Sequence, residues 1–283
     1  MEKIVITGAN GQLGRALQET YNNRGNVIAL SHEQLDITDP QEIKKFDWSD
    51  VGIIINAAAY TKVDEAESLE GQKTAQKVNT EAVRNLGKIA TQYGLTLVHV
   101  SSEYVFDGSQ QIHTEDESFN PLSVYGQTKA DGDKAAAEVA KHYIVRTSWV
   151  VGDGNNFVKT MKSLADKGIK PSVVNDQIGR LTFADDLASG IKHLLDTAAP
   201  YGTYNLTNDG EPASWCDVAK LVFSISGALT DDVTPVLTSD YYQGKKSIAA
   251  RPKNSTLDLT KIKSTGFYPP KWKDKLNEYL RTL

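Results

Sequence analysis

The sequence predicts an α/β fold in which a doubly wound parallel sheet is followed by a smaller C-terminal α/β lobe. Short apolar runs alternate with segments of helical periodicity in the first half of the chain, which is typical of a parallel sheet covered by helices on both faces. A turn with three glycines joins the first apolar run to an amphipathic helix, and beyond about residue 150 the alternation becomes irregular. We therefore expect a Rossmann-type domain over residues 1–150 and a second lobe mainly over residues 151–283, with later segments returning to the first domain.

The expected strands of the first domain are buried apolar runs at Lys3–Thr7, Asn26–Leu30, Gly52–Asn56, Thr96–Ser101 and Tyr143–Arg146. Helical patterns lie between them near Leu13–Asn23, Pro40–Lys45, Asn79–Tyr93 and Val124–Ala140. In the second half we expect helices near Asn156–Lys167, Phe183–Asp196 and Ser214–Ser226, and short strands near Ser172–Val174 and Thr203–Leu206. Right-handed βαβ units place the carboxyl ends of their strands at one edge of the sheet, so ligands should bind there.

The composition is that of a globular protein without a membrane span. The 283 residues are 40% hydrophobic and 24% charged, with a formal net charge of −5. No apolar run approaches the roughly 20 residues that a membrane span needs, and the chain starts directly in a strand. We expect a cytoplasmic protein with no membrane or nucleic-acid partner, because negative charge disfavours nucleic acid. The histidines show no metal-ligand spacing and Cys216 is the single cysteine, so neither a metal site nor an internal disulfide is predicted.

Gly8, Gly11 and Gly14 have the context of a dinucleotide-binding loop, with a strand before them and a helix after them. Glycines in such a loop permit a tight turn, a close approach of the pyrophosphate and close packing of the helix on the strand. The start of the helix supplies unpaired N–H groups to the anion. The spacing of three and three differs from the usual dehydrogenase pattern, and the alternative is an ordinary structural turn. The loop also contains the candidate cofactor-binding residues Asn10, Gln12 and Leu13.

A second group of residues indicates carbonyl reduction. Tyr125 and Lys129 are one helical turn apart, so both side chains can reach one ligand. When hydride reaches a carbonyl carbon, the oxygen must take a proton, and a phenol beside a cation can supply it. Ser102, at the end of an apolar run, can hydrogen-bond the same oxygen. The alternative for Tyr125 and Lys129 is a packed tyrosine with a solvated lysine beside it.

Several sequence blocks resemble the dTDP-4-dehydrorhamnose reductase family, within the extended short-chain dehydrogenases/reductases. They read NAAAYTKVDEAE (56–67), SSEYVFDG (101–108), PLSVYGQTK (121–129), RTSWVVGDGNNFVKTM (146–161), VNDQIGR (174–180) and ARPKNSTLD (250–258). The match covers nearly the whole chain. The glycine loop and the Tyr–Lys pair also occur in related epimerases and dehydratases, so the later blocks carry the substrate assignment.

The resemblance implies that the protein reduces the C4 carbonyl of dTDP-4-dehydro-L-rhamnose to give dTDP-L-rhamnose. It makes Tyr125 the proton donor and Lys129 its partner, with Ser102 where the family more often has threonine. The alternatives are a nucleotide-sugar 4-epimerase that keeps its NAD bound, and a non-catalytic NADP-binding regulatory subunit.

The resemblance also implies binding roles for residues outside this catalytic set. For the cofactor, besides the loop residues and the Tyr–Lys pair, it gives Asn79. The small residues among Ala57, Ala58, Ala59, Tyr60 and Thr61, after the third strand, let a cofactor lie against the backbone, and Asp36 and Ile37 are expected beside the adenine. For the substrate the resemblance gives Ser102, Glu103, Trp149, Asn156, Arg180 and Arg251, with Asn155 and Lys159 nearby. Glu103 stands where the family usually has aspartate, and Leu181 replaces a common proline. Lys159 and Arg180 have an alternative reading as solvated surface charges.

The residues around the expected adenosine site favour NADPH, with NADH as a possible substitute. Asp36 lies about 22 residues after Gly14, near the spacing of a carboxylate that binds the ribose of NAD. The second strand, however, is expected to end at Leu30, and Ser31 and His32 follow it. Neither of these repels a 2′-phosphate, and Arg15 could attract one.

The resemblance also bears on metal binding and on oligomeric state. Some members of the family use magnesium at an acidic dimer contact, but Ala16 occupies the place where an acid is expected. We therefore expect a monomer or a weak homodimer without that contact, and the role of Mg²⁺ stays open.

Overall fold

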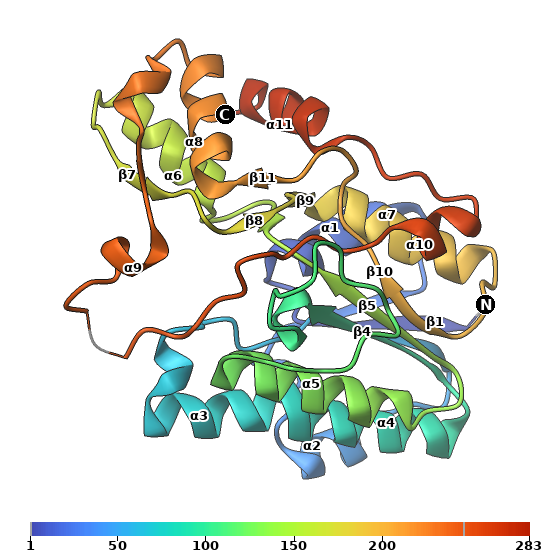
Figure 1. Cartoon of the computed structure of the whole chain (residues 1–283). Helices are drawn as coiled ribbons and strands as arrows, with labels where there is room; N and C mark the ends of the chain where they lie inside the picture. Colours follow the sequence, from blue (N-terminus) through green and yellow to red (C-terminus); the bar gives the residue numbers. More distant parts are fainter. Residues whose placement is uncertain (1, 246) are drawn as a thin grey trace.

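The computed structural model describes residues 2–245 and 247–283 and has a parallel sheet between two layers of helices, with a smaller α/β part above it (Figure 1). Over the described residues the sheet has six strands in the order β10-β5-β4-β3-β1-β2, and all neighbouring pairs are parallel. They are β1 (Lys3–Thr7), β2 (Val27–Leu30), β3 (Val51–Asn56), β4 (Thr96–Ser102), β5 (His142–Thr147) and β10 (Gly202–Asn205). The predicted Rossmann-type α/β fold is confirmed, and each predicted strand of the first domain overlaps an observed one.

The two helical layers pack on opposite faces of the sheet, because successive strand residues point to opposite sides. Ile4 and Ile6 belong to the core under one layer, whereas Val5 belongs to the core under the other. The helices of the first layer are α1 (Gln12–Thr20), α7 (Ala184–Asp196) and α10 (Thr260–Ser264). The helices of the second are α2 (Pro40–Lys45), α4 (Ala82–Tyr93) and α5 (Val124–Ala137).

The helix expected to begin at Asn79 begins ten residues earlier, which corrects that prediction. Helix α3 (Leu69–Gln76) runs through a π-helical turn at Lys77–Glu81 directly into α4. Ser68 caps α3, since its side chain accepts a hydrogen bond from Gly71 N at 3.0 Å. Asn79 therefore lies in the middle of a helical run, in the π-helical turn.

The upper part of the molecule is built around its own core of residues from α6 (Phe157–Asp166), α8 (Trp215–Ile225) and α11 (Trp272–Arg281). Short elements connect these helices: β6 (Val150–Val151), β7 (Ser172–Val174), β8 (Ile178–Gly179), β9 (Thr182–Phe183), β11 (Ala213–Ser214), β12 (Thr234–Val236) and α9 (Thr238–Tyr241). Although β10 and α7 lie beyond residue 150, they pack with the central sheet.

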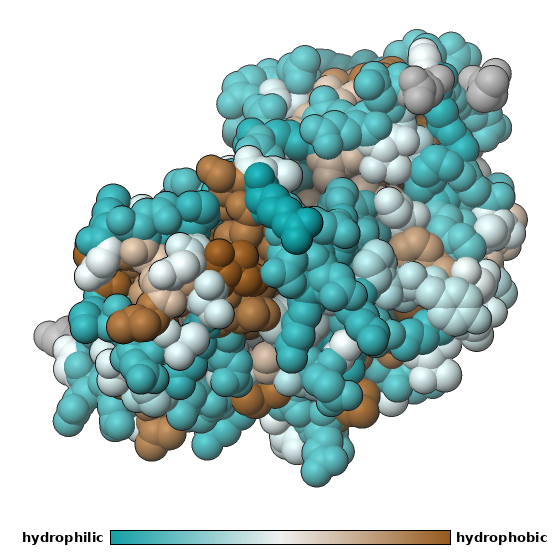
Figure 2. Space-filling view, turned by 90° about the horizontal axis from the view of Figure 1, so that it is seen from above, coloured by the Kyte–Doolittle hydropathy of each residue, from teal (hydrophilic) through white to brown (hydrophobic). Residues whose placement is uncertain are grey.

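On the face seen in Figure 2, hydrophilic residues predominate, and hydrophobic ones gather in a narrow hollow between two bulkier parts. Within the described ranges, no helix has the length and apolar character that crossing a membrane requires.

The strand order places the ligand-binding edge of the sheet. Starting from β1, the chain adds β2 on one side and β3, β4 and β5 on the other. Such a reversal opens a crevice at the carboxyl ends of the strands, here between β1 and β3. The glycine loop follows β1 at this edge, and Ser102 ends β4 beside it.

Candidate active site

A cleft of about 600 Å³ lies at the carboxyl edge of the sheet and extends toward the upper part of the molecule. Its walls come from the glycine loop, the ends of β3, β4 and β5, the start of α5, and the segment around residues 147–155. The cleft brings together twelve of the predicted site residues: Asn10, Gly11, Gln12, Leu13, Ala57, Ala59, Thr61, Ser102, Glu103, Tyr125, Lys129 and Trp149.

A second cavity, of about 540 Å³, shares Gly11, Ala57 and Ala59 with the cleft. It also contains the predicted residues Gly8, Asp36, Ile37, Ala58 and Tyr60, together with His32 and Lys77. Since the glycine loop lies between the two spaces, an extended dinucleotide fits with its adenosine end in the second cavity and its reactive end in the cleft.

The three glycines are required for different steric reasons. Gly8 has φ +73°, a conformation that L-residues with a side chain rarely adopt. A Cβ on Gly14 would lie 2.1 Å from Gly8 O, so this glycine permits the close packing of α1 on the turn. A Cβ on Gly11 would meet only Gly8 O, at 3.3 Å, and Gly11 caps α1 without a side-chain hydrogen bond. Gly11 N donates to Gly8 O at 3.0 Å, and the N–H groups of the first turn of α1 that follow it are open to an anion, which fits a pyrophosphate.

Ser102 and Glu103 form a buried pair at the end of β4. Ser102 Oγ donates a hydrogen bond to Glu103 Oε2 at 2.7 Å and accepts one from Tyr104 N at 3.2 Å. Burial raises the pKa of the Glu103 carboxyl to about 7, although the hydrogen bond from Ser102 opposes this rise. The carboxyl thus titrates near neutrality beside the predicted catalytic hydroxyl.

Tyr125 and Lys129 lie on the buried face of α5, which begins at the cap Ser123. Burial raises the pKa of the Tyr125 phenol, as does the nearby Glu103 carboxyl, whereas Ser102 lowers it. Lys129 Nζ donates to Val100 O at 2.7 Å, and burial lowers the pKa of its ammonium to about 8. In the protein alone, Lys129 is therefore directed at a backbone carbonyl of β4.

Asn79 does not line the second cavity, but it holds Tyr60, which does. Its Oδ1 accepts from Tyr60 N at 2.9 Å, and its Nδ2 donates to Tyr60 O at 3.1 Å and to Thr128 Oγ1 at 3.1 Å. This double contact fixes the loop after β3, where Ala57–Tyr60 face the expected cofactor.

Three predicted substrate residues lie outside both cavities. Asn156 caps α6 through Lys159 N at 3.0 Å, and its Nδ2 donates to Tyr279 Oη at 2.9 Å. Arg180 donates to the carbonyls of Gly210 and Leu257, at 2.7 and 3.0 Å. Arg251 Nη2 pairs with Asp64 Oδ2 at 2.8 Å, which ties the C-terminal segment to the loop after β3.

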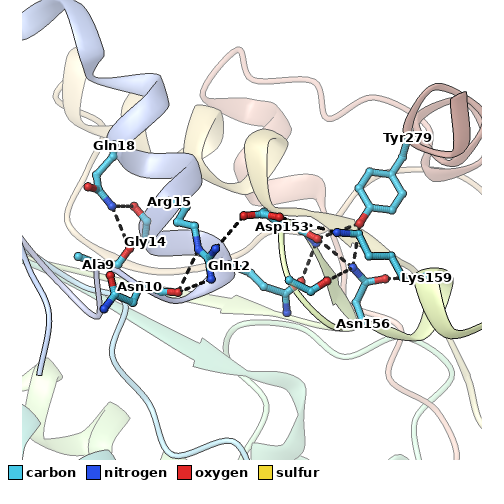
Figure 3. Close-up of polar contacts among 12 residues, drawn as sticks. Ala9, Asn10, Gln12, Gly14, Arg15, Gln18, Asp153, Asn156, Lys159 and Tyr279 are labelled. Atoms are coloured by element: carbon cyan, nitrogen blue, oxygen red, sulfur yellow. Dashed lines mark hydrogen bonds and ion pairs between the residues drawn. The ribbon is translucent and has the colours of Figure 1, made fainter. Parts of the chain in front are cut away.

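Arg15 points toward Asp153 (Figure 3), and it lines the cleft but not the second cavity. Its Nη1 pairs with Asp153 Oδ2 at 2.8 Å, and its Nε and Nη2 both donate to Asn10 O. Gln12 and Gly152 N form a second contact between the same segments, at 2.7 Å. Because a 2′-phosphate is expected at the carboxyl end of β2, the predicted attraction by Arg15 is not supported.

A negative charge that was not predicted, the Glu33 carboxylate, lies close to the end of β2. Ser31 Oγ donates to Glu33 Oε2 at 2.6 Å, so a carboxylate lies three residues beyond Leu30, where the strand ends. His32 lies in the second cavity, with its Nδ1 3.5 Å from Asp36 Oδ1. Asp36 Oδ1 accepts from Thr38 N and Oγ1, both at 2.8 Å.

The prediction missed several cleft residues, including Val63, Tyr104, Thr147 and Asp153. Tyr104 packs edge-on against Tyr125, with 5.4 Å between ring centroids. Its position directly after Ser102 and Glu103 was the available signal. Among the residues that the structure describes, no group of three or more His, Cys, Asp or Glu side chains could hold a metal ion.

The doubly wound sheet, the glycine loop and the Ser–Tyr–Lys set in one cleft define an oxidoreductase of the extended short-chain dehydrogenase/reductase class. The model of the RmlD substrate binding domain family matches residues 1–283. The chain belongs to this family, that of the dTDP-4-dehydrorhamnose reductases.

Three similar proteins support this placement. The chain is 40% identical to a dTDP-4-dehydrorhamnose reductase of Aggregatibacter actinomycetemcomitans over 98% of this chain and 97% of that protein. A crystal structure of a dTDP-4-dehydrorhamnose reductase from Clostridium acetobutylicum superposes with a TM-score of 0.91 at 38% identity, covering 99% of both chains. The Bacillus anthracis enzyme in complex with NADP also has a TM-score of 0.91, at 36% identity, covering 100% of this chain and 99% of that one.

Proposed function

We propose that this protein uses NADPH to reduce the C4 carbonyl of dTDP-4-dehydro-L-rhamnose, giving dTDP-L-rhamnose. The observation that carries the proposal is the placement of Ser102, Tyr125 and Lys129 in the cleft that also contains the glycine loop. The names of its relatives support the substrate, and the NADP complex of the Bacillus anthracis relative supports the cofactor.

The cofactor would be held by the glycine loop, by Ala57–Thr61 and by Lys129. Bound NADPH supplies the hydride. The open N–H groups after Gly11 suit its pyrophosphate, and the Lys129 ammonium can leave Val100 O to bind ribose hydroxyls. We expect NADH to substitute, because Glu33 and Asp36 place carboxylates close to the end of β2.

Tyr125 would donate the proton to the carbonyl oxygen. Burial keeps its phenol protonated in the protein alone, so the proton is present when hydride transfer begins. Ser102 would hydrogen-bond the same oxygen, which requires its hydrogen to turn away from Glu103. Lys129 and the positively charged nicotinamide product would lower the pKa of the phenol as the proton leaves.

Residues 151–283 would mainly bind the nucleotide sugar. Trp149, at the boundary, faces the cleft and offers an aromatic surface to the deoxysugar or the base. Arg251 lies beside the cleft residue Tyr104 and could reach a diphosphate if it left Asp64. Arg180 and Asn156 would act indirectly, by fixing the segments around the cleft.

The test is an assay of purified protein with the 4-keto sugar nucleotide and each nicotinamide. We expect oxidation of NADPH that falls by about 10²–10⁴-fold in Tyr125→Phe, the usual contribution of a general acid. Tyr241→Phe is the matched control, because Tyr241 is exposed on α9 and should leave the rate unchanged. Unchanged turnover in Tyr125→Phe would overturn the mechanism.

Two other results would overturn the assignment itself. Tightly held NAD with interconversion of 4-epimers would identify an epimerase. Binding of NADP without turnover of any 4-keto nucleotide sugar would identify a regulatory subunit.

A further inference from the structure

A chain of buried polar side chains crosses the sheet beneath the cleft. Thr7 Oγ1 donates to Asn56 Oδ1 at 2.7 Å, and Asn56 Nδ2 lies 3.3 Å from His99 Nδ1. His99 Nε2 lies 3.7 Å from Asp133 Oδ1, and Asp133 Oδ2 accepts from Arg146 Nε at 2.9 Å. All five residues are at most 3% exposed. Nothing in the proposed reaction yet uses His99, Asp133 or Arg146.

The hydrogen-bond partners of Asn56 decide which nitrogen of His99 carries the hydrogen. Asn56 Oδ1 accepts from Thr7 and from Ala58 N at 3.2 Å, so its Nδ2 must donate to His99 Nδ1. The hydrogen of the neutral imidazole is then on Nε2 and faces Asp133 Oδ1. Burial lowers the pKa of His99 well below its usual value, and the Lys129 charge adds to this, so His99 stays neutral.

Arg146 holds the carboxylate from the other side. Its Nη1 donates to Glu115 O at 3.0 Å, and its guanidinium lies over the rings of Phe106 and Phe119, 5.3 and 5.0 Å from their centroids. Burial raises the pKa of the Asp133 carboxyl, and the neighbouring Arg146 guanidinium opposes this rise. An ion pair with a guanidinium favours the charged form of the carboxyl. Asp133 is thereby a fixed negative charge one helical turn from Lys129 on α5.

We propose that Asp133 is a positioning residue for Lys129, the buried countercharge that keeps the Lys129 ammonium protonated and ready to bind the cofactor. This inference rests on the proposed role of Lys129. His99 and Arg146 act through Asp133: Arg146 binds Oδ2 at 2.9 Å, and His99 Nε2 lies on the Oδ1 side at 3.7 Å, so the two side chains flank the carboxylate.

The surroundings of Lys129 leave few other sources of negative charge. The titratable and charged groups that face this region are Asp133 and Tyr125 on α5, His99 on β4, Arg146 on β5 and Glu103 after β4. Burial lowers the pKa of Lys129 to about 8, and Asp133 is the group that raises it. Without this carboxylate, the ammonium would lose its proton at a lower pH.

The test is the pH dependence of NADPH affinity in Asp133→Asn, measured by fluorescence without turnover. In the wild type we expect affinity to weaken above about pH 8, as Lys129 loses its proton. In Asp133→Asn this decline should begin about one pH unit lower, so that at about pH 7.5 the Kd is roughly threefold weaker. Asp131→Asn is the matched control, because Asp131 lies on the same helix and its carboxylate accepts hydrogen bonds from Gln127 and Lys134 instead.

An unchanged pH profile in folded Asp133→Asn would overturn the proposal, as would a Kd weakened equally at every pH, which would indicate a merely structural role. If Asp133→Asn does not fold, Asp133→Glu decides: its carboxylate should keep the decline at the wild-type pH, and a decline one unit lower would contradict us. A wild-type protein that binds NADPH but reduces no 4-keto sugar would overturn the proposed function and leave this test intact.

Discussion

Trp149 stacks on Trp215 with 3.7 Å between ring centroids and 15° between ring planes. Trp149 has φ +46°, an uncommon backbone conformation for a bulky residue, and its indole packs so closely on Gly179 that a Cβ there would lie 2.9 Å away. Trp215 begins α8, in the upper part of the molecule, whereas Trp149 follows the last residues of β5. The stack therefore fixes the aromatic wall of the cleft from the side opposite the cofactor loop.

Loss of this stack should weaken substrate binding without affecting the cofactor. An aromatic pair contributes about 0.5–1.5 kcal/mol, so Trp215→Leu should raise the KM for the nucleotide sugar roughly two- to tenfold. The KM for NADPH should stay unchanged, because Trp215 does not line either cavity. Trp215→Phe retains a ring and is the matched control. Equal changes in both KM values would show that the effect is general destabilisation.

Substitutions at Gly11 and Gly14 should have different effects: one should weaken cofactor binding, and the other should lower the stability of the fold. Gly14→Ala forces a methyl group to 2.1 Å from Gly8 O, so we expect it to lower the free energy of unfolding by about 1–3 kcal/mol. Gly11→Ala meets a single atom at 3.3 Å and should leave the thermal midpoint nearly unchanged. Its methyl group would instead occupy the space expected for the pyrophosphate, so NADPH affinity should fall at least about tenfold. Wild-type affinity in Gly11→Ala would contradict this assignment.

Glu103 should make stability depend on pH near neutrality. Its pKa is about 7 in the folded protein against 4.5 in the unfolded chain, so the folded state binds the extra proton between these values. Stability is therefore highest below pH 4.5 with respect to this group and decreases as the pH rises to 7. Glu103→Gln removes the titration and should stabilise the protein by about 1–3 kcal/mol more at pH 8 than at pH 4.5 in urea unfolding.

The control for this experiment is Glu81→Gln, a change at an exposed glutamate in the π-helical turn between α3 and α4. It should give the same difference in unfolding free energy at both pH values. If Glu103→Gln also gave equal differences, the carboxyl would not titrate near neutrality in the folded state.

The strands and the catalytic set were predictable because both depend on local signals. A strand that is buried on both faces is a short apolar run, and Lys3–Thr7 and Val51–Asn56 read that way in the sequence. Ser102, Tyr125 and Lys129 follow a strand or share a helix face, so the fold itself places them at one edge. By contrast, α3 is polar and its buried residues are Gly71 and Ala75, so the sequence has no apolar periodicity that predicts this helix.

The roles of the arginines were not predictable because tertiary neighbours decide them. Arg180 has the right residue type for a diphosphate, but the carbonyls of Gly210 and Leu257, distant in sequence, use its guanidinium. Arg15 is likewise matched by Asp153, 138 positions along the chain. In both cases the arginine contacts a segment that is distant in the sequence. No local sequence pattern indicates that these segments lie side by side in the fold.

A contact of the same kind, between α7 and α11, bears on magnesium binding. Beside Ala16, a cavity of about 400 Å³ is bordered by α1, α7 and α11. Lys275 Nζ lies there, 2.8 Å from Asp185 Oδ2, 3.8 Å from Asp186 Oδ1 and 3.6 Å from Glu278 Oε2. Burial opposes the charge on Lys275, but these carboxylates together raise the pKa of its ammonium, so a built-in cation already balances them.

We therefore expect millimolar MgCl₂ and EDTA to give the same sedimentation profile, that of a monomer or a weak dimer. Lys275→Ala removes the ammonium, and since the described acidic side chains form no group that could hold a metal ion, its thermal midpoint should fall to the same extent in MgCl₂ and in EDTA. Lys273→Ala, on the same helix, is the matched control. A stable wild-type dimer that EDTA dissociates would show that Lys275 does not replace the metal.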